Sequence, residues 1–108
     1  KNLEENSGCR LQSLIMDVCD PASIQSAFEL VQAAVKYEPF HLVNNAGLSI
    51  KGPLYLMHKA DIKKVIDVNL IGLLTVTNVF LPLIRRSKGR IINIISGHGL
   101  MAIPDKSV

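Results

Sequence analysis

Short apolar runs alternate along this chain with longer segments that have a helical period. Residues 11–16 (LQSLIM), 41–43 and 90–95 (RIINII) are short runs of the kind that form buried strands. The segments between them, about 21–36 and 59–86, place apolar residues three and four positions apart. This order predicts right-handed crossovers and a parallel sheet covered on both faces. We therefore expect part of a doubly wound α/β fold, with about three strands and two to three helices.

Capping signals mark the ends of the two predicted helices. Asp20 and Pro21 supply an N-cap residue and a proline at the first helical position. In the second segment the periodic pattern stops at Gly89, a residue suited to a helix C-terminus. We expect the first helix to end near residue 36 and the second to run from about Lys59 to about Arg86.

The second predicted helix has two apolar faces. The stripe expected to cover the sheet consists of Ile62, Val65, Ile66, Asn69, Leu70 and Leu73. The other stripe consists of Val68, Ile71, Val76, Val79 and Leu83. Residues 65–84 also have the length of a bilayer crossing, but four of them are costly in hydrocarbon. These are Asp67, Asn69, Asn78 and Pro82. We therefore predict a helix buried on two sides and no membrane span in this chain.

The composition limits the class of protein further. The chain has 108 residues, 48% hydrophobic and 19% charged, which suits one compact domain or a part of one. Its net charge of +3 comes with only 5% aromatic residues, and its basic cluster at 85–90 suits the last turn of a helix. Nucleic-acid binding is therefore not expected. Cys9 and Cys19 have no CxxC or Cys/His spacing, so we expect neither a disulfide framework nor a metal site.

A polar or small-residue segment follows each of the three predicted strands. These segments are Asp17 with Val18, the turn Asn44-Asn45-Ala46-Gly47, and Ser96 with Gly97. Because parallel strands end at one edge of the sheet, where such sheets bind ligands, we expect the three segments to lie together. Taken alone, the NNAG turn equally fits a tight turn, and Ser96 fits the end of a strand.

Asn69 lies in the stripe that is expected to face the sheet. A buried amide without hydrogen-bond partners costs about 1 to 3 kcal/mol. We therefore expect the Asn69 side chain to be hydrogen-bonded or to hold an ordered water.

Five sequence blocks, taken in order, resemble the short-chain dehydrogenase/reductase (SDR) family. They are Asp17-Val18, LVNNAG at 42–47, DVNLIG at 67–72, FLPLIRRSKGRIINI at 80–94, and Ser96. The resemblance covers nearly the whole chain with the family's spacing. It implies that residues 1–108 are the central part of a single NAD(P)-binding Rossmann-fold domain.

The resemblance also implies roles for the matching residues. Asp17 and Val18 would contact the adenine of NAD or NADP, and Asn69 would be catalytic, holding a water in a proton relay. Ser96 would be the catalytic, substrate-binding serine that hydrogen-bonds the reacting oxygen. The turn residues that would line the cofactor are Asn45, Ala46 and Gly47.

Some family features are altered in this sequence or would lie outside it. Ile95 stands where the family usually has Gly or Ser, which alters the expected pocket wall beside Ser96. The family's Gly-rich phosphate loop would precede Lys1, and its Tyr-x-x-x-Lys pair would begin just beyond Val108. We therefore expect the 108-residue chain alone to have no oxidoreductase activity.

For the complete protein, the resemblance implies hydride transfer between a nicotinamide and an alcohol carbon. The apolar runs GPLYLM and LMAIP indicate a hydrophobic alcohol or ketone of the retinoid, steroid or lipid type. The rival interpretation is a non-catalytic dinucleotide-binding or scaffold protein on the same fold. The resemblance further implies a homodimer or homotetramer formed through the 59–86 helix. An intracellular location is expected, either cytoplasmic or, with an anchor upstream, at the membrane of the endoplasmic reticulum or mitochondrion.

Overall fold

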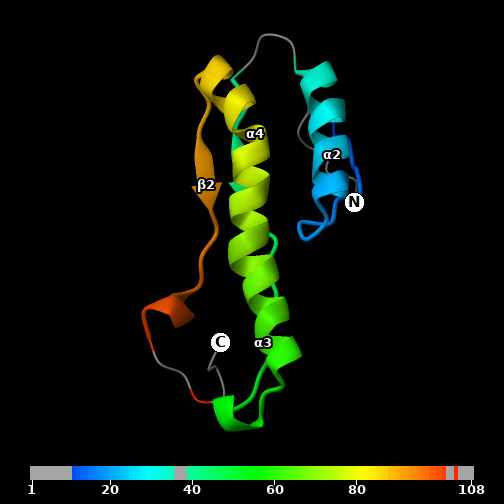
Figure 1. Ribbon diagram of the computed structural model, residues 1–108. Coiled ribbons are helices and arrows are strands. Elements are labelled where there is room, and N and C mark those ends of the chain that lie inside the picture. The colour runs from blue at the N-terminus through cyan, green and yellow to red at the C-terminus, as the bar shows by residue number, and fades with distance from the viewer. Residues whose placement is uncertain (1–10, 36–38, 102–103, 105–108) are drawn as a thin grey trace.

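The computed structural model describes residues 11–35, 39–101 and 104. A long helix runs through the centre of the described chain, with α2 on one side and β2 on the other (Figure 1). The elements are α2 (Pro21–Ala34), β1 (Leu42–Asn44), η1 (Leu54–Leu56), α3 (Lys59–Ile66), η2 (Asp67–Gly72), α4 (Leu73–Ser87), β2 (Ile91–Asn93) and η3 (Gly97–Gly99).

β1 and β2 form a parallel pair. Their register places Leu42 opposite Ile91 and Asn44 opposite Asn93. The Ile94 amide donates a hydrogen bond to the Asn44 carbonyl at 2.9 Å, which continues the ladder beyond β2. The connection between the strands contains the long helix, as a crossover between parallel strands requires. The parallel sheet and its helical connection are therefore confirmed.

The first predicted strand is wrong, because residues 11–16 have no regular secondary structure. A strand requires a neighbour that shares its hydrogen-bond ladder. In the doubly wound order 3-2-1-4-5-6, two strands separate the third strand from the fourth. Along the chain, the run 11–16 takes the place of the third strand and β1 that of the fourth. The two would therefore not be neighbours in the sheet. Ile15, in the middle of the run, is fully exposed.

α2 begins where its capping signal predicts. The Asp20 carboxylate accepts a hydrogen bond from the Ala22 amide at 3.0 Å, and Pro21 occupies the first helical position. The helix ends at Ala34, about two residues earlier than expected, because Val35 has extended backbone angles. β1 is shifted by one residue from the predicted run 41–43, and β2 is shorter than the predicted run 90–95. Only three residue pairs share the ladder.

The second predicted helix is one continuous column made of α3, η2 and α4. Its middle part, η2, is a π-helix, a wider turn that is frequent at functional sites. The column ends at Ser87, close to the predicted Arg86, because Lys88 adopts a left-handed conformation with φ of 55°. The Gly89 amide then donates to the Ile84 carbonyl at 2.9 Å, which completes the helix end.

The hydrophobic core lies where α4 meets α2 and β1. Its buried side chains are Ile24, Val76, Phe80 and Ile84. The ring of Phe80 meets Phe28 edge-on, with centroids 5.4 Å apart, and stacks on Phe40 at 5.8 Å. Aromatic pairs at such distances contribute about 0.5 to 1.5 kcal/mol beyond their burial.

The expected faces of the long helix are partly wrong. Val76 and Leu83, from the second stripe, are buried, whereas Ile66 and Leu70, from the stripe expected to face the sheet, are exposed. The reason is α2, which supplies Ile24 to the core cluster beside Val76 and so covers that part of the second stripe, whereas Ile71 of the same stripe stays 50% exposed. Of the exposed apolar residues of the helix, Ile66, Leu70 and Leu74 are four residues apart and form one row along it.

By length and composition, the helix Lys59–Ser87 could cross a membrane. Its α4 part nevertheless supplies the four buried residues Val76, Phe80, Leu83 and Ile84 to the fold. The expectation of a helix buried on two sides is only partly met, because 22% of its most apolar 18-residue stretch is buried in the described structure.

Candidate functional site

The carboxyl ends of β1 and β2 bring two of the sequence-predicted segments to one edge. Asn44 and Asn93 are paired in the register. Gly47 and Ser96 each follow their strand's last residue by three positions. Because the strands are parallel, the NNAG turn and Ser96 leave the sheet at the same edge, where sheets of this kind bind ligands.

A buried asparagine ties this edge together. Asn44 is the one buried polar residue among those described, and its amide donates to the Asn93 side-chain oxygen at 2.8 Å and to the Thr77 hydroxyl at 2.9 Å. These bonds join β1, β2 and α4. Asn44 thus locks the two neighbouring strands together, through partners, Thr77 and Asn93, that the sequence pattern does not predict. The strand alternation offered a signal, because Leu42 and Asn44 share the inner face while Val43 is exposed.

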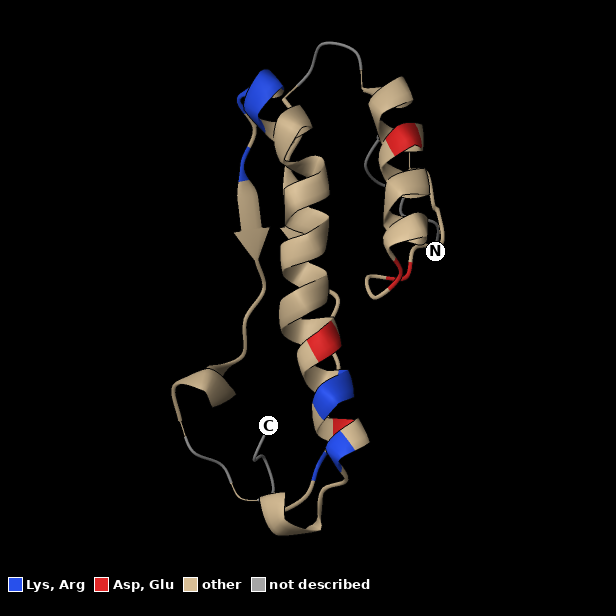
Figure 2. Cartoon of the chain, viewed as in Figure 1, with Lys and Arg blue, Asp and Glu red and all other residues tan. Residues whose placement is uncertain are grey.

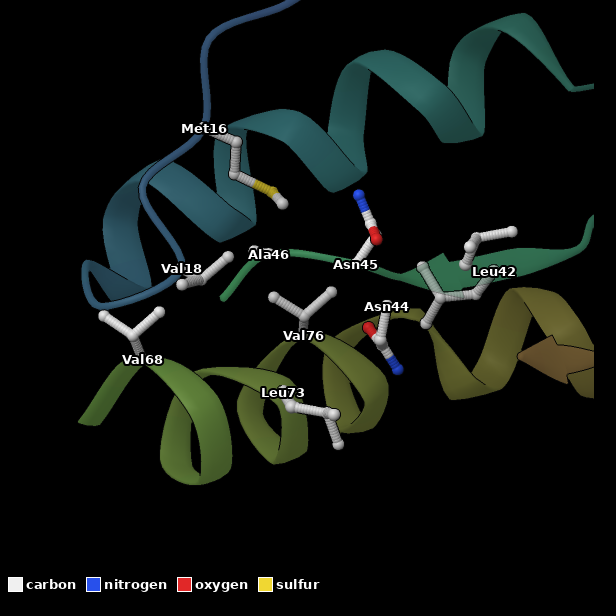
Figure 3. A pocket seen from close by; sticks show the side chains of 10 residues that line it. Met16, Val18, Leu42, Asn44, Asn45, Ala46, Val68, Leu73 and Val76 are labelled. Atoms are coloured by element: carbon white, nitrogen blue, oxygen red, sulfur yellow. The ribbon is translucent and has the colours of Figure 1, made fainter. Parts of the chain in front are cut away.

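A pocket of about 80 Å³ collects three of the cofactor candidates: Val18, Asn45 and Ala46. Figure 3 shows Met16 and Val18, from the segment before α2, facing Val76 of the long helix. Ala46 and Asn45 lie between them, with the Asn45 side chain directed away from that of Asn44. The walls of the pocket are mainly apolar.

Asp17 and Val18 lie in a tight turn just before the N-terminus of α2. The Asp17 carboxylate accepts the Cys19 amide at 2.8 Å, and the Asp17 amide donates to the Ser23 hydroxyl at 2.9 Å. Val18 packs on the helix backbone at Gly72, where a Cβ would lie 2.9 Å from the Val18 side chain. The turn is therefore held against η2 by close contact that only glycine permits.

Asn69 is hydrogen-bonded, but it is exposed rather than buried. Its side-chain oxygen accepts the Leu48 amide and its nitrogen donates to the Leu48 carbonyl, both at 2.8 Å. These two hydrogen bonds to the backbone of Leu48 fix the loop that follows the NNAG turn. A Cβ on Gly47 would lie 3.7 Å from the Asn69 oxygen, so Gly47 and Asn69 are neighbours. The amide keeps one N–H and one lone pair for another partner.

Ser96 lies at the start of η3 and is exposed. Its hydroxyl oxygen accepts the His98 amide at 3.2 Å. The hydroxyl proton remains available to a second acceptor, because a serine hydroxyl has one donor and two acceptor positions. The structure thus groups Val18, Asn45 and Ala46 around one pocket and pairs Gly47 with Asn69, while Ser96 shares only the edge of the sheet with them.

The described residues contain no cluster of three or more metal-ligating side chains. Cys19 is a free, exposed thiol, and Cys9 lies outside the described residues. The polar groups at the edge are amides, a carboxylate and a hydroxyl, which suit hydrogen bonding to an organic ligand.

A parallel sheet, a helical crossover and a carboxyl edge lined by small and polar residues are features of the doubly wound α/β class, in which ligands bind at the strand ends. The family model described as short chain dehydrogenase matches residues 1–108. The chain therefore belongs to the short-chain dehydrogenase family.

Curated relatives agree with this membership. The chain is 44% identical over 95 residues to a 3-amino-tetrahydro-pyrrolizinone reductase of Xenorhabdus hominickii, covering 87% of this chain and 33% of the relative. It is 38% identical over 111 aligned positions to the mitochondrial D-beta-hydroxybutyrate dehydrogenase of Mus musculus, covering 99% and 32%. It is 40% identical over 105 residues to retinol dehydrogenase 7 of Rattus norvegicus, covering 95% and 33%. The chain thus spans about a third of the length of these relatives.

A solved structure has the same arrangement of elements. The ligand-free aldohexose dehydrogenase of Thermoplasma acidophilum superposes with a TM-score of 0.83 and 25% sequence identity. The match covers 92% of this chain and 39% of that protein. The Rossmann-like fold class expected from the sequence is therefore confirmed for this part of the domain.

Proposed function

We propose that the full-length protein is an NAD(P)-dependent oxidoreductase that interconverts an alcohol and its carbonyl compound. The observation that carries this proposal is that Gly47 and Ser96 occupy equivalent positions beyond their strands. Each follows by three residues one member of the pair Asn44 and Asn93. That edge offers a place for a flat cofactor beside a hydroxyl donor. The relatives named as reductase and dehydrogenases support the reaction type, and the mitochondrial one supports an intracellular location.

The residues of this chain fit a dinucleotide along the edge. Asp17 and Val18 would hold its adenine, and the small residues Ala46 and Gly47 let the backbone approach it closely. The room beside Gly47 supports this fit, because a Cβ there would meet no described heavy atom closer than 3.7 Å. When bound, the cofactor supplies the nicotinamide carbon that accepts or gives the hydride.

Ser96 and Asn69 have different tasks in this proposal. The Ser96 hydroxyl, whose oxygen accepts the His98 amide, donates a hydrogen bond to the substrate oxygen and so orients it. Asn69 holds the loop at Leu48 in place, and its remaining amide capacity can bind a water that exchanges protons with solvent. The expected tyrosine and lysine beyond Val108 would supply the acid that acts on the same oxygen.

The proposed substrate is a hydrophobic alcohol or ketone. Leu100 and Met101, which follow the serine turn, are both largely exposed apolar side chains at this end of the molecule. They would form an apolar wall for a substrate whose oxygen meets Ser96. The name of the retinol dehydrogenase among the relatives supports a hydrophobic alcohol, and that of the hydroxybutyrate dehydrogenase supports an alcohol substrate in general.

Replacing Gly47 with leucine in the full-length protein is expected to weaken binding of NAD(H) or NADP(H) at least roughly tenfold. The new side chain would occupy the space that the proposal gives to the cofactor, while its Cβ makes only ordinary contacts with Asn69 and Asn45. Titration of protein fluorescence with the reduced cofactor measures the affinity. The matched control is Ala33→Leu, which introduces a leucine side chain at an exposed position of α2. Unchanged affinity in a folded Gly47 variant would remove this edge from the cofactor site.

We further propose that the protein forms a homodimer or homotetramer through the exposed row Ile66, Leu70 and Leu74. An apolar helix face of this kind is self-complementary across a two-fold axis. Changing both Leu70 and Leu74 to aspartate should convert the full-length protein to monomers in analytical sedimentation. Leu30→Asp on α2, also at an exposed leucine, should leave assembly unchanged. A wild-type protein that already sediments as a monomer would contradict this assembly.

A further inference from the structure

The η1 turn exposes three consecutive large apolar side chains. Leu54, Tyr55 and Leu56 are 58%, 85% and 66% exposed. η1 lies at one end of the elongated molecule, beyond the start of α3 (Figure 1). Contiguous apolar surface of this kind in water marks a binding surface.

The exposure of this turn differs in origin from that of the sheet residues. Val43 and Ile92 belong to strands, whose outer faces are covered by helices in a doubly wound fold. The η1 turn lies outside the sheet, in the connection between β1 and α3. Asn69 fixes the start of this connection at Leu48, and the helix column holds its other end. The turn is therefore held at both ends, and its side chains are exposed in the part of the chain that the structure describes.

Lys51 and Lys59 flank this apolar turn in the sequence, and Lys64 lies one to two helical turns further along α3. These three lysines are exposed and form no ion pair with any residue that the structure describes, whereas Lys63 pairs with Asp67. Figure 2 shows the blue segments of α3 next to the uncharged η1 turn, with a red segment between them, where Asp61 lies in the first turn of the helix. Lys59 is the first residue of α3, where the positive end of the helix dipole disfavours a cation. Helix stability therefore does not explain its position.

We propose that the η1 tip, defined as Leu54–Leu56, inserts into an anionic lipid surface. Tyrosine and leucine at a tip favour the boundary between headgroups and acyl chains, and lysine stems extend so that the ammonium groups meet lipid phosphates. Three side chains offer well under the roughly 800 Å² per partner of a standard protein interface, which favours a lipid surface over a folded protein partner. The protein would bind the membrane peripherally. Because η1 lies at one end of the helix column, the long axis of the column would point toward the lipid surface (Figure 1).

The test is co-sedimentation of the full-length protein with vesicles of phosphatidylcholine, with and without about 30% phosphatidylserine. We expect binding to the anionic vesicles that falls as salt is added. Changing Tyr55 and Leu56 to serine should lower the vesicle-bound fraction roughly tenfold. Changing Lys59 and Lys64 to glutamine should abolish the preference for phosphatidylserine. The matched control is Leu30→Ser, because Leu30 is 64% exposed on α2 and no lysine stands within four residues of it in the sequence.

Two experimental results would overturn the lipid proposal. One is vesicle binding that is the same in the Tyr55/Leu56 variant and in the wild type. The other is no vesicle binding by the wild type, accompanied by a raised KM for a soluble substrate in the Tyr55/Leu56 variant, which would assign the tip to the substrate site. Because vesicle binding is measured without cofactor or substrate, its outcome is independent of the proposed oxidoreductase activity.

Discussion

Replacing Gly89 with alanine is expected to lower the free energy of unfolding by about 3 kcal/mol. The added Cβ would lie 1.7 Å from the Phe40 carbonyl oxygen and 2.7 Å from its carbon, inside the contact distance of any pair of atoms. The backbone of Phe40 has little freedom to move away. Its amide donates to the Ser87 hydroxyl at 3.0 Å, and its ring stacks on Phe80. The chain segments at Phe40 and Gly89 would therefore move apart, and the alignment of β1 with β2 would be disturbed.

Denaturant unfolding of the full-length protein measures this effect. Gly99→Ala is the matched control, because no described atom lies within 4 Å of the Cβ that it would add. A Gly89 variant with the same unfolding midpoint as the control would show that the close crossing at Phe40 does not constrain the fold.

Replacing Ser96 with alanine is expected to lower kcat roughly 100- to 1000-fold. The hydroxyl is the donor that the proposal places on the reacting oxygen, and no other described hydroxyl leaves the sheet at this edge in the same register. The His98 amide bonded to the Ser96 oxygen would lose its acceptor, which costs about 1 kcal/mol of local stability. This loss is too small to unfold a domain, so the change in turnover reports on chemistry.

Two variants separate the chemical role of Ser96 from a structural one. Ser96→Thr keeps a hydroxyl and should retain most of the turnover that alanine removes. Ser26→Ala removes a hydroxyl of α2 that bonds only to the Ala22 carbonyl, and it should leave kcat unchanged. Turnover of Ser96→Ala within twofold of the wild type would exclude the serine from the mechanism.

The helices and the two strand-forming runs of β1 and β2 could be predicted because the signals for each element are local. Asp20 with Pro21 marks the start of α2, and the period of apolar residues carries through to Ser87 despite Pro82. The strand at 11–16 could not form, because pairing depends on neighbours far away in sequence rather than on its own apolar residues. The same argument explains Ile15, an apolar residue at a strand-like position that is fully exposed.

The orientation of the long helix could not be read from its sequence. Both of its stripes are apolar, so the periodicity does not say which one α2 covers. The choice depends on where Ile24 and Phe28 meet Phe80, a contact between elements. This is why Asn69 is exposed at the Leu48 loop rather than buried against the sheet.

The candidate site was partly visible in the sequence. The alignment of NNAG and Ser96 on one edge follows from parallel strands alone. The pairing of Asn44 with Asn93 and Thr77 does not, because it depends on register and on the rotation of α4. The double hydrogen bond of Asn69 to Leu48 depends in the same way on the course of the connecting loop.

The most direct test of the oxidoreductase proposal is isotope transfer by the full-length protein. Reduced nicotinamide cofactor carrying deuterium at C4 would be incubated with hydrophobic ketones, and the alcohols formed would be examined by mass spectrometry. We predict alcohols with deuterium on the carbinol carbon, formed by the wild type and at least roughly 100-fold more slowly by Ser96→Ala. Cofactor binding without deuterium in any alcohol would contradict the proposal and favour a non-catalytic dinucleotide-binding protein on the same fold.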